Sequence, residues 1–470
     1  MALTLSKIEE IAPDQGSLAA ARKLLKAQSW PTLASDDSGL MWGECQGSGS
    51  SPYRVVVSEL DLGYKCTCPS RKFPCKHTLA LMWMRAENRP FGKHERPVWV
   101  NDWLARRRGP ANSSKAGSAK EPDESRPKVS IAAAESEVAS DPKAEARAAA
   151  QRERSRAERE ASILAGLEQL DRWIIDQVDR GLAGFQAVAN EQCRLLSRRL
   201  ADAKASGLAG RVERLPADMF GLPEPMRGDF LIEKLGELHV IAEAYRRQLE
   251  LPEALRADVR QAIGWTMTRE ALLAEPRALK ARDRWMVLAT VNEVQPDKLR
   301  RLDTWLARLG TGEAPRFAVL TDFAPVSIGA VRTTYSPGET FDAELIFYPS
   351  PAPLRAAIVE QFGATSMEGR WLTPPDAVPA ALDGYEAGLA ARPWLGDWPL
   401  AVHDAIVARG PDGFVLTHAE GSTMLPIKAK DDDMILPLVG VAGIDAFGLW
   451  DGRQLDLKFA ETPLGRWVSA

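Results

Sequence analysis

The sequence lacks long apolar runs, an excess of charge of one sign, and a high cysteine content. Its longest nearly apolar stretch, Met434–Ile444, covers 11 residues, well short of the roughly 18 that would suggest a membrane-spanning helix. The 60 Lys and Arg and the 64 Asp and Glu give a net charge of -4, which excludes a generally basic nucleic-acid coat. Five cysteines among 470 residues exclude a disulfide-dense scaffold. We therefore expect a globular chain in which any polyanion-binding surface is local.

The first residues also lack a targeting signal. Met1–Ser17 has no basic head followed by an apolar run, which is the pattern of a secretory signal. We therefore expect a cytoplasmic protein without a membrane partner. In that reducing compartment, clustered cysteines are more often ligands or nucleophiles than disulfides.

Composition and periodicity divide the chain into four regions. Residues 1–108 form the first. Residues 109–160 contain only three large apolar side chains, so we interpret them as a flexible charged linker, although 144–160 is rich in helix formers. Residues 161–282 have helical spacing, and 283–470 form a mixed α/β, strand-rich C-terminal region. The expected fold class is multidomain α+β, with an N-terminal ββα zinc module, the flexible linker, a helical domain and a C-terminal β-rich region.

The same patterns predict individual elements. Helices are expected over 17–28, 77–86, 182–204, 230–249 and 255–266. Strands are expected over 40–46, 53–60, 285–294, 316–322 and 340–347. After residue 395, short apolar runs separated by Gly and Asp turns indicate an antiparallel sheet or a small barrel. These runs are 401–408, 413–417, 423–427, 434–439, 447–450 and 454–459.

One segment carries recognisable chemistry. Cys66, Cys68, Cys75 and His77 follow the pattern Cys-x-Cys-x6-Cys-x-His. Zinc prefers four nitrogen or sulfur ligands in a tetrahedron, and a closed Cys₃His set leaves no open position for water. A redox pair would usually be Cys-x-x-Cys near a βαβ unit, which is absent here. We therefore predict one structural zinc ion held by these four residues.

This signature, preceded by two strands and followed by a helix, resembles the SWIM zinc finger. The run Cys68-Pro-Ser-Arg-Lys-Phe-Pro-Cys75-Lys-His77-Thr-Leu-Ala-Leu is similar to bacterial SWIM zinc finger family proteins in particular. The linker and a helix containing Leu167–Trp173 also look like the bacterial layout. The resemblance implies a zinc-binding ββα module that contacts DNA or protein. It also implies protein partners, namely an AAA-type ATPase and a von Willebrand type A protein, which are often encoded beside the bacterial relatives.

Positive charge is concentrated on the predicted finger and its tail. Between Lys65 and Arg108 there are 11 Lys and Arg against three Asp and Glu, a net +8, whereas residues 1–64 carry a net −3. Aromatic residues interleave with these cations, a mixture that can bind phosphates and stack on bases. The candidate nucleic-acid contacts are Arg71, Lys72, Lys76, Arg106, Arg107 and Arg108. The alternative is a solvated cationic face, with Trp99 and Trp103 packing a short helix back onto the finger.

No motif nominates a catalytic residue. The patterns GxxxxGK[ST], HExxH, GxSxG and GxGxxG after a strand are absent, and we interpret Cys45 and Cys193 as packing residues. We favour an interaction scaffold or regulator that contacts proteins of an ATPase-containing assembly. A DNA- or RNA-binding regulator and an enzyme with an unrecognised site in the C-terminal half are the alternatives. We expect no enzymatic activity, with the C-terminal half left open.

Overall fold

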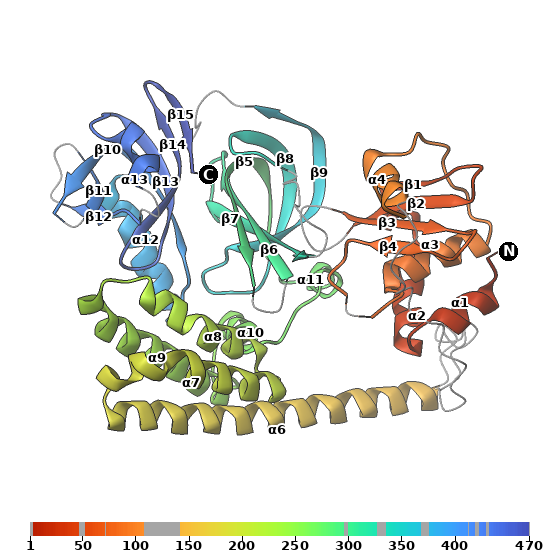
Figure 1. Cartoon of the computed structure of the whole chain (residues 1–470), viewed down its shortest axis with the longest axis horizontal. Coiled ribbons are helices and arrows are strands. Elements are labelled where there is room, and N and C mark those ends of the chain that lie inside the picture. Colours follow the sequence, from red (N-terminus) through yellow and green to blue (C-terminus); the bar gives the residue numbers. More distant parts are fainter. Residues whose placement is uncertain are drawn as a thin grey trace. The chain divides into compact units, whose positions relative to one another are not determined.

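The computed structural model forms two compact units, and each is described by itself (Figure 1). The first contains the residues up to 149, and the second contains nearly all those from 150 on. The predicted α+β class is confirmed, and among the described helices none is long and apolar enough to cross a membrane. The structure describes residues 3–46, 52–70, 72–107, 142–295, 299–326, 335–367, 376–411, 413–418, 423–428 and 432–469.

The first unit is built on a four-stranded sheet in the order β1-β2-β3-β4, with antiparallel neighbours. Its strands are β1 (Thr32–Ser35), β2 (Leu40–Cys45), β3 (Tyr53–Ser58) and β4 (Tyr64–Cys66). Its helices are α1 (Leu5–Ile11), α2 (Gln15–Arg22), α3 (Lys76–Ala86) and α4 (Val98–Arg107). The predicted order of two strands, cysteine turn and helix is confirmed, and α1, β1 and β4 are additions.

The alternating side chains of β2 and β3 explain why helices lie on both faces of this sheet. Met41 and Val55 pack against the core formed with α1, α2 and α3. Trp42 and Val56, one residue further along, face the opposite way and pack against Trp103 of α4. The alternative that the paired tryptophans pack a short helix onto the finger is therefore confirmed.

The second unit begins with a bundle around one apolar core, which includes Leu167, Leu196, Leu238 and the fully buried Tyr245. Its helices are α6 (Pro142–Arg180), α7 (Leu182–Asp202), α8 (Ser206–Phe220), α9 (Glu224–Arg246), α10 (Glu253–Ile263) and the short α11 (Arg269–Leu273). Because α6 begins at Pro142, residues 142–160 of the predicted linker are helical, whereas 108–141 lie outside the described residues. The domain boundaries stay a prediction.

A closed five-stranded barrel follows the bundle, in the order β5-β6-β7-β9-β8. Its strands are β5 (Lys280–Val294), β6 (Leu299–Arg308), β7 (Phe317–Pro325), β8 (Glu339–Phe347) and β9 (Arg355–Met367). Strands β7 and β9 pair in parallel, whereas β8 is antiparallel to both β5 and β9. The sequence predicted β5, β7 and β8 but missed β6 and β9.

A six-stranded sheet in the order β12-β11-β10-β13-β14-β15 closes the chain, and its neighbours are antiparallel as predicted. Its strands are β10 (Trp398–Gly410), β11 (Gly413–His418), β12 (Met424–Pro426), β13 (Ile444–Trp450), β14 (Leu455–Thr462) and β15 (Gly465–Val468), and helix α12 (Val378–Ala391) precedes them. The strand-like interpretation of 434–439 was wrong. That segment contains the end of α13 (Asp432–Ile435) and a 3₁₀ turn, Leu436–Leu438. Ile435 and Leu438 are buried at a spacing of three, which suits a helical turn better than a strand.

Candidate metal centre

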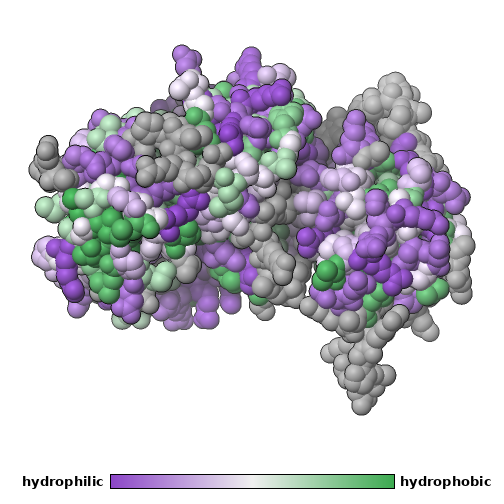
Figure 2. Space-filling view, turned by 90° about the horizontal axis from the view of Figure 1, so that it is seen from above, coloured by the Kyte–Doolittle hydropathy of each residue, from purple (hydrophilic) through white to green (hydrophobic). Residues whose placement is uncertain are grey.

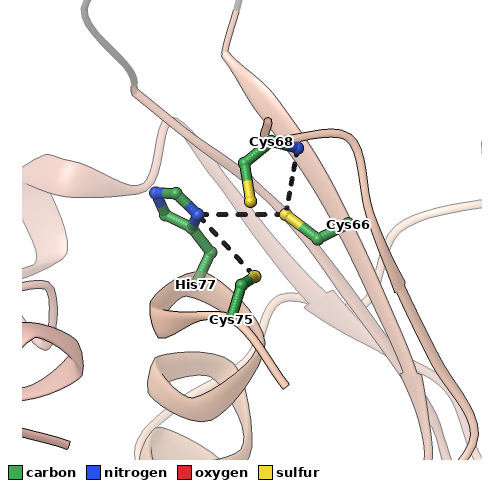
Figure 3. A group of neighbouring side chains, drawn as sticks. All are labelled: Cys66, Cys68, Cys75 and His77. Carbon is green, nitrogen blue, oxygen red and sulfur yellow. Dashed lines mark hydrogen bonds between the residues drawn. The ribbon is translucent and has the colours of Figure 1, made fainter. Parts of the chain in front are cut away.

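Four side chains from two neighbouring elements converge in the first unit (Figure 3). Cys66 ends β4, and Cys68 lies two residues further along in the turn. Cys75 is the N-cap residue of α3, and His77 lies in the first turn of that helix. Their ligand atoms all lie within 4.8 Å of one another. The turn therefore brings the second Cys-x-His pair back onto the first Cys-x-Cys pair.

The packing of β3 and α3 holds this arrangement in place. Strand β4 pairs with β3, with Cys66 opposite Val55, so the first ligand belongs to the sheet and Cys68 follows it in the turn. Helix α3 packs on the same sheet through Leu79 and Trp83, both fully buried. The ring of Tyr53 lies 5.0 Å from the ring of His77 at an angle of 49°. Sheet and helix thus present their ligands from two sides of the cluster.

The spacing of the cluster fits a tetrahedral zinc ion. Zinc–sulfur bonds of about 2.3 Å and zinc–nitrogen bonds of about 2.0 Å put tetrahedral ligand atoms roughly 3.5–3.8 Å apart. The Nδ1 atom of His77 lies 3.9 Å from Sγ of Cys66 and 3.9 Å from Sγ of Cys75. The ring nitrogen that faces the thiols is therefore Nδ1, as Figure 3 shows. Little movement is needed to bring all four atoms into coordinating distance.

Burial and mutual hydrogen bonding set the protonation of the thiols. Cys75, Cys68 and His77 are 1%, 3% and 4% exposed. The pKa of Cys66 is well above the ordinary thiol value because hydrogen bonds to Cys68 and Cys75 hold its proton, and burial adds to this effect. The pKa of Cys75 is well below it because the Cys66 and Cys68 thiols donate hydrogen bonds to its sulfur. A bound cation favours the deprotonated form of all three thiols.

The other two cysteines are not part of this cluster. Cys45 is fully buried in the core of the first unit. Cys193 is 1% exposed on α7 in the core of the bundle, and burial raises its pKa to about 12. Neither forms a disulfide, and their interpretation as packing residues is confirmed.

Of the six predicted nucleic-acid contacts, only Lys72 and Lys76 have described side chains, so the set stays a prediction. Lys72 binds Asp14 at 2.6 Å, and Lys76 is half-buried in the first turn of α3. Arg71 and Arg108 lie outside the described residues. Arg106 and Arg107 belong to α4, but their side chains also lie outside the described part of the chain.

Folding pairs many cations of the finger with the acidic segment before it. Besides the Lys72–Asp14 pair, three further ion pairs join these two stretches of sequence. They are Arg85–Glu59 at 2.6 Å, Arg96–Asp36 at 2.5 Å and Lys93–Asp37 at 3.7 Å. The visible face of this unit, on the right of Figure 2, is mostly hydrophilic. Residues 1–108 still carry a net +5. Four of the cations between Lys65 and Arg108, however, are paired with carboxylates of residues 1–64 in the same unit.

The sequence analysis missed a second group with metal-binding atoms. Asp171 of α6 and His239 and Glu243 of α9 have ligand atoms within 4.8 Å of one another. The His-x3-Glu spacing on one helix face was the available signal. Arg246, however, forms ion pairs with both Asp171 and Glu243, so a cation already balances these carboxylates. We interpret this group as an ion-pair network.

Comparison with known families agrees with this geometry. Residues 53–86 match the family model of the SWIM zinc finger, and residues 158–263 match that of the SWIM-associated four-helix bundle domain. The first match covers β3, the four clustered residues and α3, and the second covers the helices from α6 to α10. None of the curated proteins and none of the solved structures compared with the chain is a match. The chain therefore combines a SWIM zinc finger, with a site suited to one zinc ion, and a SWIM-associated four-helix bundle.

Proposed function

We propose that this protein is an interaction scaffold or regulator whose finger is shaped by one structural zinc ion bound to Cys66, Cys68, Cys75 and His77. The four protein ligands complete the coordination of the ion, so its contribution is to hold β4 against α3 rather than to activate water. The proposed partners are proteins, and a complex with an AAA-type ATPase and a von Willebrand type A protein rests on the family resemblance alone.

One observation supports protein contact over nucleic-acid contact. Most cations of the finger whose side chains the structure describes pair with acidic side chains of the same unit, as in the Arg85–Glu59 and Arg96–Asp36 pairs. Binding to a polyanion depends on cations that exchange condensed counterions for phosphates. A cation that must first leave a carboxylate contributes less to such binding. Among the described residues, Lys65 and Lys76 form no ion pair. The DNA- or RNA-binding alternative depends on such cations and on the candidates outside the described side chains, Arg71, Arg106, Arg107 and Arg108.

Affinity purification from the native host, with and without nuclease, tests this proposal. We expect the full chain to retain its protein partners after nuclease treatment. Cys68→Ser should lose them because the finger no longer holds zinc, whereas the double variant Lys65→Ala/Lys76→Ala should retain them. Partners that disappear with nuclease, or that depend on the two lysines, would favour the nucleic-acid alternative. A salt-titrated gel shift with the same variants provides the direct comparison.

The enzyme alternative concerns the C-terminal half. A pocket of about 420 Å³ lies between the barrel, α12 and β10, and its lining includes Phe317, Leu354 and Trp398. A nucleophile and a base within hydrogen-bond reach are the usual signature of covalent catalysis. The carboxylates that line this pocket are Glu313 and Asp376, and Asp376 forms an ion pair with Arg316. The zinc finger and the bundle are domains of typically non-catalytic families. The enzyme alternative for the C-terminal half therefore stays an alternative.

A further inference from the structure

The strand order of the barrel identifies its topology. Numbered along the chain, strands one to five are β5 to β9, and they close in the order 1-2-3-5-4. The third and fifth strands pair in parallel, and the fourth pairs antiparallel with the first and the fifth. This is the Greek-key arrangement of the OB-fold, in which the face of strands two and three, with the adjoining loops, binds oligonucleotides or oligosaccharides.

The alternation of side chains shows which residues form that face here. Leu306 of β6 and Leu320 of β7 point into the barrel, where they pack with Trp285. Trp305 of β6 and Val319 of β7 are one residue out of phase and belong to a different apolar cluster. Because successive residues of a strand point to opposite sides, Trp305 and Val319 lie on the outer face, where an OB-fold holds its ligand.

That outer face is covered by the chain itself. The cluster around Trp305 is completed by side chains of the C-terminal sheet: Ala401 of β10, Phe447 and Leu449 of β13, and Phe459 of β14. Phe447 is fully buried, and its ring centroid lies 6.5 Å from that of Trp305 and 5.9 Å from that of Phe317. Leu354, in the loop between the fourth and fifth strands, is part of the same cluster. The sheet therefore occupies both the strand face and a loop that an OB-fold uses for binding.

The chemistry of the contact suits a permanent occupant. A face that binds single-stranded nucleic acid presents exposed aromatic rings for stacking and a groove of cations. Here Trp305 is 6% exposed, and Ala307 and Leu288 beside it are buried among aliphatic and aromatic side chains. Separating the two surfaces would expose a continuous apolar patch on each, a feature that monomeric soluble proteins avoid.

We propose that the ligand face of this OB-type barrel serves as a docking surface for the C-terminal sheet, so that the barrel and residues 398–468 fold as one body. The barrel then acts as a protein interface between the parts of the second unit and not as a reader of nucleic acid. This inference is independent of the proposed function of the finger, because the residues that carry it all belong to the second unit.

Hydrogen exchange of the full, zinc-loaded chain with and without an oligo-dT probe tests the proposal. We expect the amides of β6 and β7 to keep the same protection when the probe is added. In a denaturant series, the amides of β6, β7 and β13 should show the same opening free energy. That value should equal the free energy of unfolding of the barrel and the C-terminal sheet together. Protection of β6 and β7 by oligo-dT, or photocrosslinking of the probe to them, would overturn the proposal. So would an opening in which β6 exchanges well before β13.

Two matched variants make the test specific. Phe447→Ala should reduce the protection of β6, β7 and β13 together, because it removes the side chain that packs against the rings of Trp305 on β6 and Phe317 on β7. Phe414→Ala is the control, since Phe414 is 3% exposed on β11 and packs in the other core of the same sheet. It should weaken β11 and leave β6 comparatively protected. If Phe447→Ala fails to fold, Phe447→Leu keeps the comparison, and equal effects of Phe447 and Phe414 variants on β6 would count against the docking surface.

Discussion

The two units of this chain solve the problem of stability differently. Beside its apolar core, the first contains a three-residue strand, β4, and a turn with two prolines, which bury little by themselves. Four ligand side chains tie that turn to α3. The second unit has no described counterpart of this thiol cluster and instead buries long apolar faces of helices and strands. The difference indicates that metal chemistry stands in for burial where the chain is short and polar.

Removing zinc should give the largest difference between the units. Structural zinc contributes an apparent binding free energy of about 10–16 kcal/mol in zinc-finger peptides, more than the typical stability of a small domain. We expect Cys68→Ser or a strong chelator to unfold the β4–α3 region and to leave the second unit folded. Limited proteolysis followed by mass spectrometry should show cleavage near the cysteine turn while residues 163–470 stay resistant.

Cys45→Ala is the matched control for this experiment, because Cys45 is a buried thiol of the same unit outside the ligand cluster. It should keep one zinc per chain in elemental analysis and cost only the small loss of a trimmed core side chain. A wild-type chain with well under one zinc, or a Cys68→Ser chain whose second unit also becomes protease-sensitive, would contradict the comparison.

A buried carboxylate in the second unit should give the next largest effect. Asp258 of α10 is 6% exposed. It accepts hydrogen bonds from Nε1 of Trp394 at 2.7 Å, from Arg392 at 3.2 Å and from the hydroxyl of Ser350. Asp258→Ala leaves the guanidinium of Arg392 without its partner, and breaking such a buried pair costs about 3–5 kcal/mol. Chemical denaturation should show this loss in the second unit alone.

The control for Asp258→Ala is an exposed acidic residue of the same helix. Glu253 pairs with Arg277, and their side chains are 70% and 80% exposed. Exposed pairs contribute about 0–1 kcal/mol, so Glu253→Ala should be nearly neutral. If both variants destabilised the second unit equally, the burial of Asp258 would not be the cause.

The contrast between the units also explains what the sequence could reveal. The zinc cluster was predictable because its ligands are close in sequence and their spacing constrains the geometry, as in Cys66 and Cys68. Strand β6 was not, because it carries charged residues among buried ones. Arg308 is 7% exposed within it, and its partner Asp283 comes from another strand. Such pairing between distant residues leaves no periodic signal along the chain.

The ion pairs of the finger also could not be predicted from local sequence patterns. The local excess of cations was correct as a count, but their carboxylate partners lie 26 to 60 residues away in sequence, as in Arg85–Glu59 and Arg96–Asp36. Only the folded sheet brings them together. The fold class and the metal site were therefore accessible from local patterns, whereas the barrel topology and the balance of surface charge depend on long-range contacts.

A smaller effect is expected from the ion pair on the finger's surface. Asp14 caps the N-terminus of α2 through a 2.7 Å bond from the Ser17 amide, and its pKa is lowered chiefly by the hydrogen bond from Lys72. The pKa of an Asp side chain in the unfolded chain is near 4. Because folding lowers the pKa of Asp14, the ionised side chain stabilises the fold at any pH above that value, neutral pH included. This stabilisation is lost as the pH falls through the pKa of Asp14 in the folded protein. Lys72→Ala should cost at most about 1 kcal/mol.

Asp14→Ala should cost more than Lys72→Ala, because it removes the helix cap as well, and a lost cap costs about 1 kcal/mol on its own. Thermal unfolding of the zinc-loaded chain at neutral pH measures both variants. A Lys72→Ala effect equal to that of Asp14→Ala would mean that the ion pair, and not the cap, carries the stabilisation.

The smallest effect concerns the one thiol of the second unit, Cys193. Its pKa of about 12, raised by burial, leaves roughly one thiol in ten thousand ionised near pH 8, and only the thiolate is reactive. An aromatic disulfide reagent should therefore leave Cys193 unmodified in the native chain. After chelation, Cys66, Cys68 and Cys75 should react while Cys193 stays silent. Its modification at the same rate as the released ligands would mean that the bundle opens with the finger, and the two units would then not be stabilised independently.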